Sequence, residues 1–147
     1  MFKTLRDFLR SRKYWVLALY FVVYILAFFI IEEHTPTEGY WVTDTFIDSY
    51  IPFVPGFAVF YILWYPLFAA VGIPTLIKDG EAFKRWMYYN MFTLTATLVL
   101  DVLIPNGQHL RPQDVQVTDL GTWIMSIIWA ADTPTNVFPS MHVLGCL

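Results

Sequence analysis

Charged residues are scarce in this sequence. Asp, Glu, Lys and Arg make up 14% of its 147 residues, whereas about 25% is usual in soluble domains. Hydrophobic residues account for 57% of the chain and aromatic residues for 19%. This composition excludes an ordinary soluble globular domain and favours a membrane protein with a single domain.

Cysteine is almost absent. The single cysteine, Cys146, excludes an internal disulfide bond, and no metal-ligand spacing surrounds it. We expect it to be a small apolar residue inside a helix. The acidic residues between positions 32 and 50 match no ligand motif either. We therefore expect neither a metal ion nor any other cofactor.

Three long segments are nearly free of charge. Residues 14–31 contain no charged side chain and would span about 27 Å as a helix, close to the thickness of the hydrocarbon layer. Residues 57–77 and 86–104 are the second and third candidate spans. Before the first span, residues 1–13 combine basic side chains with apolar side chains at helical spacing, which predicts a cytoplasmic amphipathic segment at the membrane surface.

Two shorter apolar segments follow. Residues 122–131 are too few to cross a membrane and predict an interfacial helix. A fourth span begins at about residue 140, and we expect the 147 residues to be a truncated form of a longer protein. The prediction is an all-α integral membrane protein whose membrane domain covers residues 14–147. It has three transmembrane helices, a short interfacial helix and the start of a fourth span.

The polar loops at residues 32–50 and 105–121 contain only one basic residue, Arg111. Eight of the nine Lys and Arg residues lie in residues 1–13 or in an expected charged loop at residues 78–85. The positive-inside rule makes both segments cytoplasmic and leaves residues 32–50 and 105–121 on the outer side. We expect a plasma-membrane protein with a cytoplasmic N-terminus. Arg111 is the one basic residue on the outer side, so it is a candidate site residue.

Two polar motifs on that side have the chemistry of a phosphate site. In Pro139-Ser140-Met141-His142, Ser140 suits a helix N-cap, and the free N–H groups of a helix start attract anions. His142 can exchange a proton near neutral pH. Arg111, followed by Pro112, can bind phosphate with two parallel hydrogen bonds. The same residues also suit an ordinary helix cap and an ordinary loop arginine, and both interpretations remain open.

The order of these motifs resembles a known family. Arg111-Pro112 followed by the run DTPTNVFPSMH at residues 132–142 is similar to the first two motifs of the type 2 phosphatidic acid phosphatase superfamily, K-x6-R-P and P-S-G-H. The Pro-Ser-Met-His form resembles the branch shared with inositol phosphorylceramide synthases. The resemblance covers residues 101–147. It implies a six-helix membrane enzyme that needs no metal, in which Arg111 and Ser140 hold phosphoryl oxygens and His142 is the general acid.

Three features depart from the family pattern. The motif lysine would fall at position 104, which is Ile104, and the motif glycine is Met141. The third motif, S-R-x5-H-x3-D, is absent; in the family its histidine is the nucleophile and its aspartate orients that histidine. His109 precedes Arg111 by two residues and is a further candidate beside the phosphate, although no motif spacing assigns it a role.

Three functions follow as hypotheses. The first is a membrane lipid-phosphate phosphatase or phosphotransferase that lacks its nucleophile-bearing C-terminal part, so we expect this chain alone to be inactive. Its partners would be the bilayer and a phosphorylated lipid or isoprenyl phosphate, with no nucleic acid; oligomeric state is left open. The second is a non-catalytic small membrane protein or gene fragment that binds a partner or phosphate only. The third is part of a transporter or channel, which only Asp101 and the prolines of the second span support.

Overall fold

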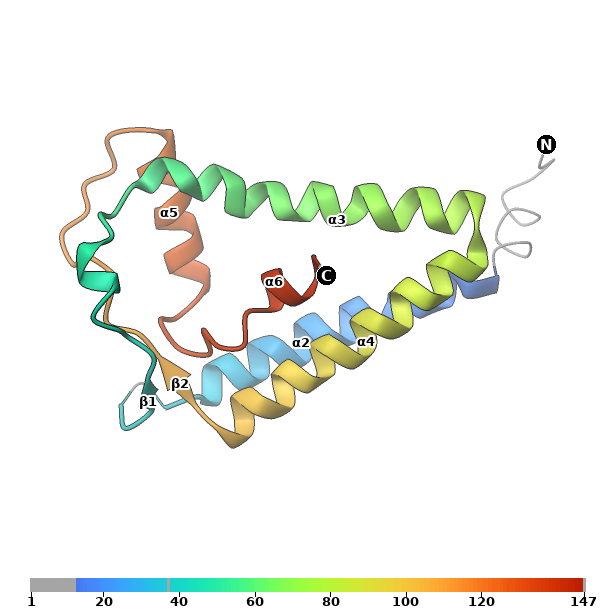
Figure 1. Ribbon diagram of the computed structural model, residues 1–147, viewed down its shortest axis with the longest axis horizontal. Helices are drawn as coiled ribbons and strands as arrows, with labels where there is room; N and C mark the ends of the chain where they lie inside the picture. Colours follow the sequence, from blue (N-terminus) through green and yellow to red (C-terminus); the bar gives the residue numbers. More distant parts are fainter. Residues whose placement is uncertain (1–12, 37, 147) are drawn as a thin grey trace.

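The protein is mostly helical, and long helices run between its two ends (Figure 1). The computed structural model describes residues 13–36 and 38–146. A 3-10 helix, η1 (Lys13–Ala18), continues into α2 (Leu19–His34), and together they match the first expected span. The predicted amphipathic segment at residues 1–13 lies outside the described residues, apart from Lys13.

The second expected span is also a helix. A short 3-10 helix, η3 (Pro55–Phe57), leads into α3 (Ala58–Lys78). Pro55 occupies the first helical position, where proline costs no intrahelical hydrogen bond. Among the described residues, the two helical segments Lys13–His34 and Pro55–Lys78 are long and apolar enough to cross a membrane.

The third expected span corresponds to α4 (Gly80–Leu103), but its boundaries differ from the prediction. The charged loop expected at residues 78–85 is wrong, because only Asp79 separates α3 from α4. The Asp79 carboxylate accepts hydrogen bonds from the N–H groups of Glu81 (3.1 Å) and Ala82 (3.0 Å) and so starts the helix six residues early. With its additional polar side chains, α4 is not among the helices apolar enough to cross, so a third transmembrane helix stays a prediction.

The buried face of α4 organises the packing. It lies beside α2, and it also contacts η1, α3 and α6 (Figure 1). Polar groups on this face bond within the helix: Asn90 Nδ2 donates to the Trp86 carbonyl (2.8 Å) and Thr97 Oγ1 to the Leu94 carbonyl (2.7 Å). These bonds satisfy donors that would otherwise lack water. Six of the seven buried positions alternate at spacings of four and three residues: Phe83, Met87, Asn90, Leu94, Thr97 and Asp101; the seventh is Thr93.

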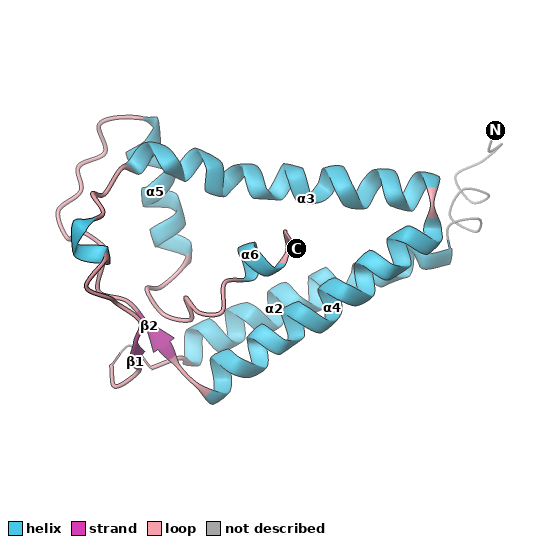
Figure 2. Ribbon diagram, in the orientation of Figure 1, coloured by secondary structure: helices cyan, strands magenta, loops and turns pink. Residues whose placement is uncertain are grey.

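A small strand pair departs from the all-α prediction. β1 (Trp41–Val42) pairs in parallel with β2 (Asn106–Gly107), and a bridge joins Gly107 to Thr135. Both strands lie at one end of the molecule, together with the 3-10 helix η2 (Asp48–Tyr50) and the loops (Figure 2). Segments of only two residues carry no readable alternation, so the sequence did not indicate them.

The two short helices near the C-terminus were expected. α5 (Leu120–Ala131) begins two residues before the predicted interfacial helix, because Asp119 and Thr122 form a reciprocal capping box. α6 (Met141–Leu144) begins where the fourth span was predicted, and Ser140 Oγ accepts the Val143 N–H (3.4 Å) as its cap. α6 lies between α3 and α4 (Figure 1).

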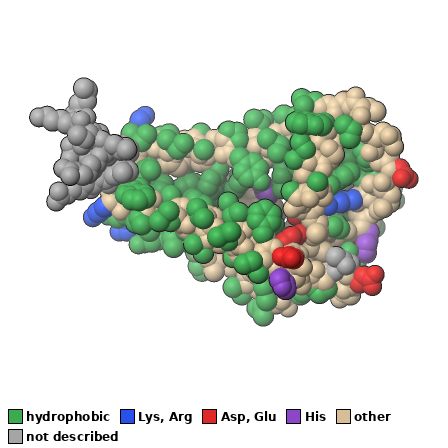
Figure 3. All heavy atoms as spheres, turned by 180° about the vertical axis from the view of Figure 1, so that it is seen from behind, with side chains coloured by type: hydrophobic (Ala, Val, Ile, Leu, Met, Phe, Trp, Pro, Cys, Tyr) green, Lys and Arg blue, Asp and Glu red, His purple; other side chains and the backbone are tan. Residues whose placement is uncertain are grey.

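Charge separates between the two ends of the molecule. Figure 3 shows most of the visible Lys and Arg side chains at one end, and Asp, Glu and His side chains gathered at the other. η1 packs on α4, and the Tyr14 hydroxyl donates to the Glu81 carboxylate, so Lys13 and the α3–α4 turn share the basic end. The two polar loops therefore meet at the opposite end, as the sequence predicted.

Candidate functional site

Arg111 reaches the loop that precedes Pro139-Ser140-Met141-His142. Its Nη1 donates to the Asp132 carbonyl (2.7 Å) and its Nη2 to the Thr133 carbonyl (2.6 Å). Nη2 also lies 3.7 Å from Asp132 Oδ2. The fold thus joins the two motifs that the sequence separates, and Arg111 holds the backbone of the second motif's loop in place.

Part of the Arg111 guanidinium remains free. Its Nε is buried and has no hydrogen-bond partner among residues 13–36 and 38–146. The Trp129 ring lies 6.0 Å from the guanidinium carbon, within range of a cation–π contact. Burial lowers the pKa of Arg111, although the Asp132 and Glu32 carboxylates oppose that shift. A guanidinium stays charged at physiological pH, so the site combines a positive charge with one unused donor.

Asp132 is a site residue that the sequence analysis did not single out. Burial, followed by the nearby Glu32 carboxylate, raises its pKa to about 6, and Arg111 acts in the opposite direction. Near neutral pH Asp132 is therefore mostly ionised, and its carboxylate competes with any anion for Arg111. The sequence signal that could have indicated Asp132 is its position in the polar run just before the Pro-Ser motif.

Glu32 ties the same loop to the end of α2. Its side chain is 8% exposed. Oε1 accepts the Thr133 N–H (2.9 Å) and the Thr133 hydroxyl, and Oε2 accepts from Asn136 Nδ2 (3.1 Å). Sequence analysis interpreted Glu32 as part of an acidic loop. No local pattern indicates a contact across about a hundred residues of chain.

Asn106 fixes the loop from a third direction. Its side chain is 1% exposed, and its amide accepts the Phe138 N–H (2.9 Å) and donates to the Phe138 carbonyl (2.7 Å). The Asn106 carbonyl also accepts the Asn136 N–H (2.6 Å). Gly107 permits this approach, since a side-chain carbon there would lie 2.9 Å from the Pro134 carbonyl oxygen. The loop at residues 132–139 is therefore held by an arginine, a carboxylate and an amide.

Ser140 acts as a cap, and the helix that it caps is short. The Ser140 hydroxyl accepts the Val143 N–H, and α6 ends at Leu144. The cap matches the helix start that the sequence predicted, and the anion site at this start stays a prediction.

His142 packs against aromatic rings of α3. Its ring centroid lies 4.3 Å from that of Tyr61, 4.8 Å from Trp64 and 6.2 Å from Tyr65. His142 Nε2 is buried and finds no hydrogen-bond partner in the described ranges. Tyr61 is a neighbour of His142 that the sequence analysis missed.

His109 lies in a different cluster. Its Nε2 is 3.3 Å from the Tyr40 hydroxyl, and its Nδ1 is 3.3 Å from Asp44 Oδ2. Its backbone N–H donates to the same carboxylate (3.1 Å). Within the described part of the chain it forms no hydrogen bond with Arg111, so the structure assigns His109 to the contact between the two polar loops.

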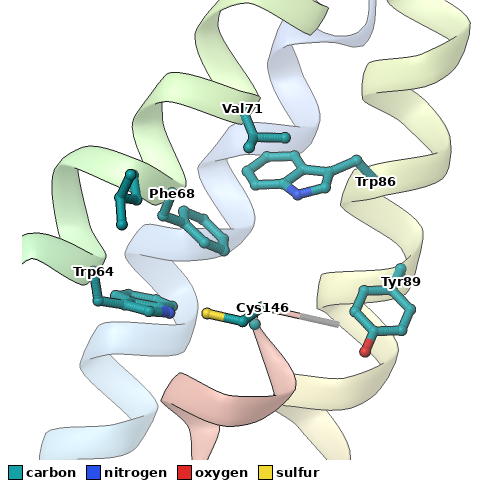
Figure 4. A pocket seen from close by; sticks show the side chains of 8 residues that line it. Trp64, Phe68, Val71, Trp86, Tyr89 and Cys146 are labelled. Carbon is teal, nitrogen blue, oxygen red and sulfur yellow. The ribbon is translucent and has the colours of Figure 1, made fainter. Parts of the chain in front are cut away.

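An apolar cavity of about 420 Å³ opens beside the end of α6. Trp64 and Phe68 of α3 face Trp86 and Tyr89 of α4 across it, and Cys146 lies at its edge (Figure 4). The expectation of Cys146 inside a helix is wrong, because α6 ends before it and the residue is exposed. Aromatic walls of this kind suit an apolar ligand.

No group of three or more His, Cys, Asp and Glu side chains among residues 13–36 and 38–146 has the arrangement of a metal site. Comparison of the chain with protein families, with curated proteins and with solved structures finds no match.

Proposed function

We propose that this chain forms the phosphate-binding part of a membrane protein that acts on lipid phosphate esters at the outer face, as in the type 2 phosphatidic acid phosphatases that it resembles. One observation carries the proposal. Arg111 is bound to the loop that leads into Pro139-Ser140-Met141-His142, and its Nε remains without a partner among the described residues. A buried arginine donor suits a phosphate monoester, and a histidine just after the same loop can exchange a proton.

In this proposal α4 crosses the membrane as a third helix, beside α2 and α3. α2 and α3 are apolar enough to cross, and α4 packs beside both of them. The polar side chains of α4 bond to its own carbonyls, which removes part of the cost of placing it in lipid. Basic residues gather at the end that holds Lys13 and the α3–α4 turn, and that end is cytoplasmic in this proposal.

Phosphate binding here is a competition with Asp132. The ligand would take the place of the Asp132 carboxylate beside Arg111, while the two backbone carbonyls keep the guanidinium in position. If a nucleophile outside these 147 residues attacked the phosphorus and the ester P–O bond broke, His142 would protonate the leaving oxygen. The chain contains no third motif to supply a nucleophile, so the 147 residues bind the ester and release no phosphate by themselves.

An apolar substrate tail has a place in the same proposal. The aromatic cavity between α3 and α4 adjoins α6, which carries His142. An acyl or isoprenyl chain would bury apolar surface there while its phosphate stays at the polar end.

The test is equilibrium binding of dihexanoyl phosphatidic acid to the purified chain in nanodiscs, measured by calorimetry. Arg111→Gln should weaken binding by about tenfold or more, the loss expected for a charge-assisted hydrogen bond. Lys84→Gln, at the basic end, is the matched control and should retain the affinity. Equal losses in the two variants would mean that binding is non-specific attraction and would refute the proposal.

A second candidate is a non-catalytic membrane protein. It is favoured by the use of both Nη atoms of Arg111 for backbone carbonyls, which is a structural role. The two functions separate in the same experiment. If Arg111→Gln lowers the unfolding temperature and the wild-type chain binds no phosphatidic acid, the structural role alone remains.

A further inference from the structure

Two buried carboxylates lie at the outer end, and their surroundings differ. Glu32 is 8% exposed and accepts three hydrogen bonds from Thr133 and Asn136. Asp101 is 3% exposed, yet its Oδ1 has no hydrogen-bond partner in the part of the chain that the structure describes. Burying a carboxylate without donors is costly, so an unpaired one needs an explanation.

Asp101 borders a groove. The ends of α2 and α4 enclose a space of about 230 Å³, with Asp101 on the α4 side and His34 and Thr35 on the α2 side. The groove lies where both helices end, at the level of the polar loops, and is separate from the cavity beside α6. Its apolar walls come from Ile30, Ile31, Val102 and Pro105.

The polar groups of the groove are mainly acceptors. His34 Nδ1 lies 2.7 Å from the Ile30 carbonyl. A carbonyl can only accept, so Nδ1 carries a proton, which leaves Nε2 as the ring nitrogen that can accept. The Thr35 hydroxyl is occupied, because it donates to the Ile31 carbonyl (2.9 Å) and accepts from Asn136. A ligand that fits must therefore supply hydrogen-bond donors, and a positive charge would match Asp101.

We propose that this groove binds a protonated primary amine attached to an apolar body, with the ammonium group donating to the Asp101 carboxylate. A primary ammonium has three N–H donors for the carboxylate and for His34. A quaternary ammonium has none, and the groove lacks an aromatic wall among its lining residues. Two sources share this chemistry, a lipid headgroup of the ethanolamine type and a free alkylamine. This proposal does not rest on the phosphate site.

The experiment measures binding of two primary amines to the full chain in phosphatidylcholine nanodiscs by calorimetry. The probes are dihexanoyl phosphatidylethanolamine and n-hexylamine, and their quaternary counterparts are dihexanoyl phosphatidylcholine and hexyltrimethylammonium. We expect each bound primary amine to bind about tenfold tighter than its counterpart. Binding of the lipid alone identifies a headgroup site, and binding of both probes identifies a general amine site.

Asp101→Asn should weaken the amine affinity by about tenfold, because it removes the charge and keeps the shape. Asp114→Asn, at an exposed position on the same side, is the matched control and should have no effect. If Asp101→Asn fails to fold, Val102→Phe tests the proposal instead, since Val102 is 59% exposed and lines the groove, so that a phenyl ring there would fill it while Asp101 is unchanged. Unchanged affinity in the folded groove variant, or equal binding of primary and quaternary probes, would overturn the proposal.

Discussion

The two ends of the molecule connect the same helices in opposite ways. At the basic end a single residue, Asp79, joins α3 to α4. At the acidic end the chain forms two long loops, a strand pair, α5 and the loop at residues 132–139. In the short connection, the Asp79 side chain accepts hydrogen bonds from two N–H groups in the first turn of α4. The long connections bring distant polar side chains together, which is where binding residues usually lie.

Charge sharpens this comparison. The basic end carries cations that are exposed or only weakly paired, such as Lys84, which lies 3.6 Å from Glu81. At the acidic end Arg111 is half-buried and bonded to two backbone carbonyls. Exposed ion pairs contribute little, whereas a buried charge must be matched by its surroundings. Substitutions at the two ends should therefore have very different effects.

The largest effect should come from Asn106 at the acidic end. Asn106→Ala leaves the Phe138 N–H and carbonyl unpaired in a buried place and should lower the free energy of unfolding by about 3 kcal/mol. Denaturant unfolding in mild detergent would measure the change. Asn106→Asp keeps the acceptor of the Phe138 N–H but turns a buried carboxylate oxygen toward the Phe138 carbonyl, so it should lose at least as much. A loss below about 0.5 kcal/mol, the size usual at neutral surface positions, would show that the loop is not held by this amide.

Removal of Glu32 should have the next largest effect. Glu32→Ala leaves three donors of the 132–139 loop unpaired, but it also removes a negative charge beside Asp132. We expect a net loss of about 2 kcal/mol in the free energy of unfolding. Glu33→Ala is the matched control, because Glu33 is the exposed neighbour. The assignment of Glu32 to this loop would be rejected by equal losses in the two variants.

The pH dependence of the acidic end should follow Asp132. Its pKa of about 6 lies above its ordinary 3.8, so between about pH 4 and pH 6 the native protein holds more protons than the unfolded chain. The unfolding free energy from this group therefore falls as pH rises through that window. Protonation also frees Arg111, so a singly charged phosphodiester should bind about fivefold tighter at pH 5 than at pH 7.5.

A diester is chosen for this measurement because it does not titrate in that range. Asp132→Asn should bind the diester equally well at both pH values and about as tightly as the wild type at pH 5. A pH dependence that survives in Asp132→Asn would assign the titration to another group, such as a histidine.

The smallest effect should come from the short connection. Asp79→Ala removes the side-chain acceptor of two N–H groups and should cost about 1 kcal/mol, the usual value of an N-cap. Phosphatidic acid affinity should stay within about twofold, because the change is at the opposite end and small effects at distant sites are independent. A tenfold loss of affinity would show that the two ends are coupled.

Local signals in the sequence predicted most of the helices, but they missed the strand pair and the start of α4. Uninterrupted apolar length predicted α2 and α3, and the Ser140 cap predicted the start of α6. The start of α4 was misplaced because Asp79 and the charged residues after it were interpreted as a loop. Charge and an N-cap acceptor in the first turn also favour a helix. The low hydropathy of these residues predicted a loop, whereas the Asp79 cap makes them the first turns of α4.

The sequence by itself determined which polar residues share one end of the molecule, because apolar length and the distribution of Lys and Arg separate the loops into two groups. It also singled out Arg111 and His142 by residue type and order. Only the tertiary structure decided their partners: carbonyls of the 132–139 loop for Arg111, and aromatic rings of α3 for His142. Contacts of this kind join residues that are far apart in the chain, and local periodicity and capping carry no information about them.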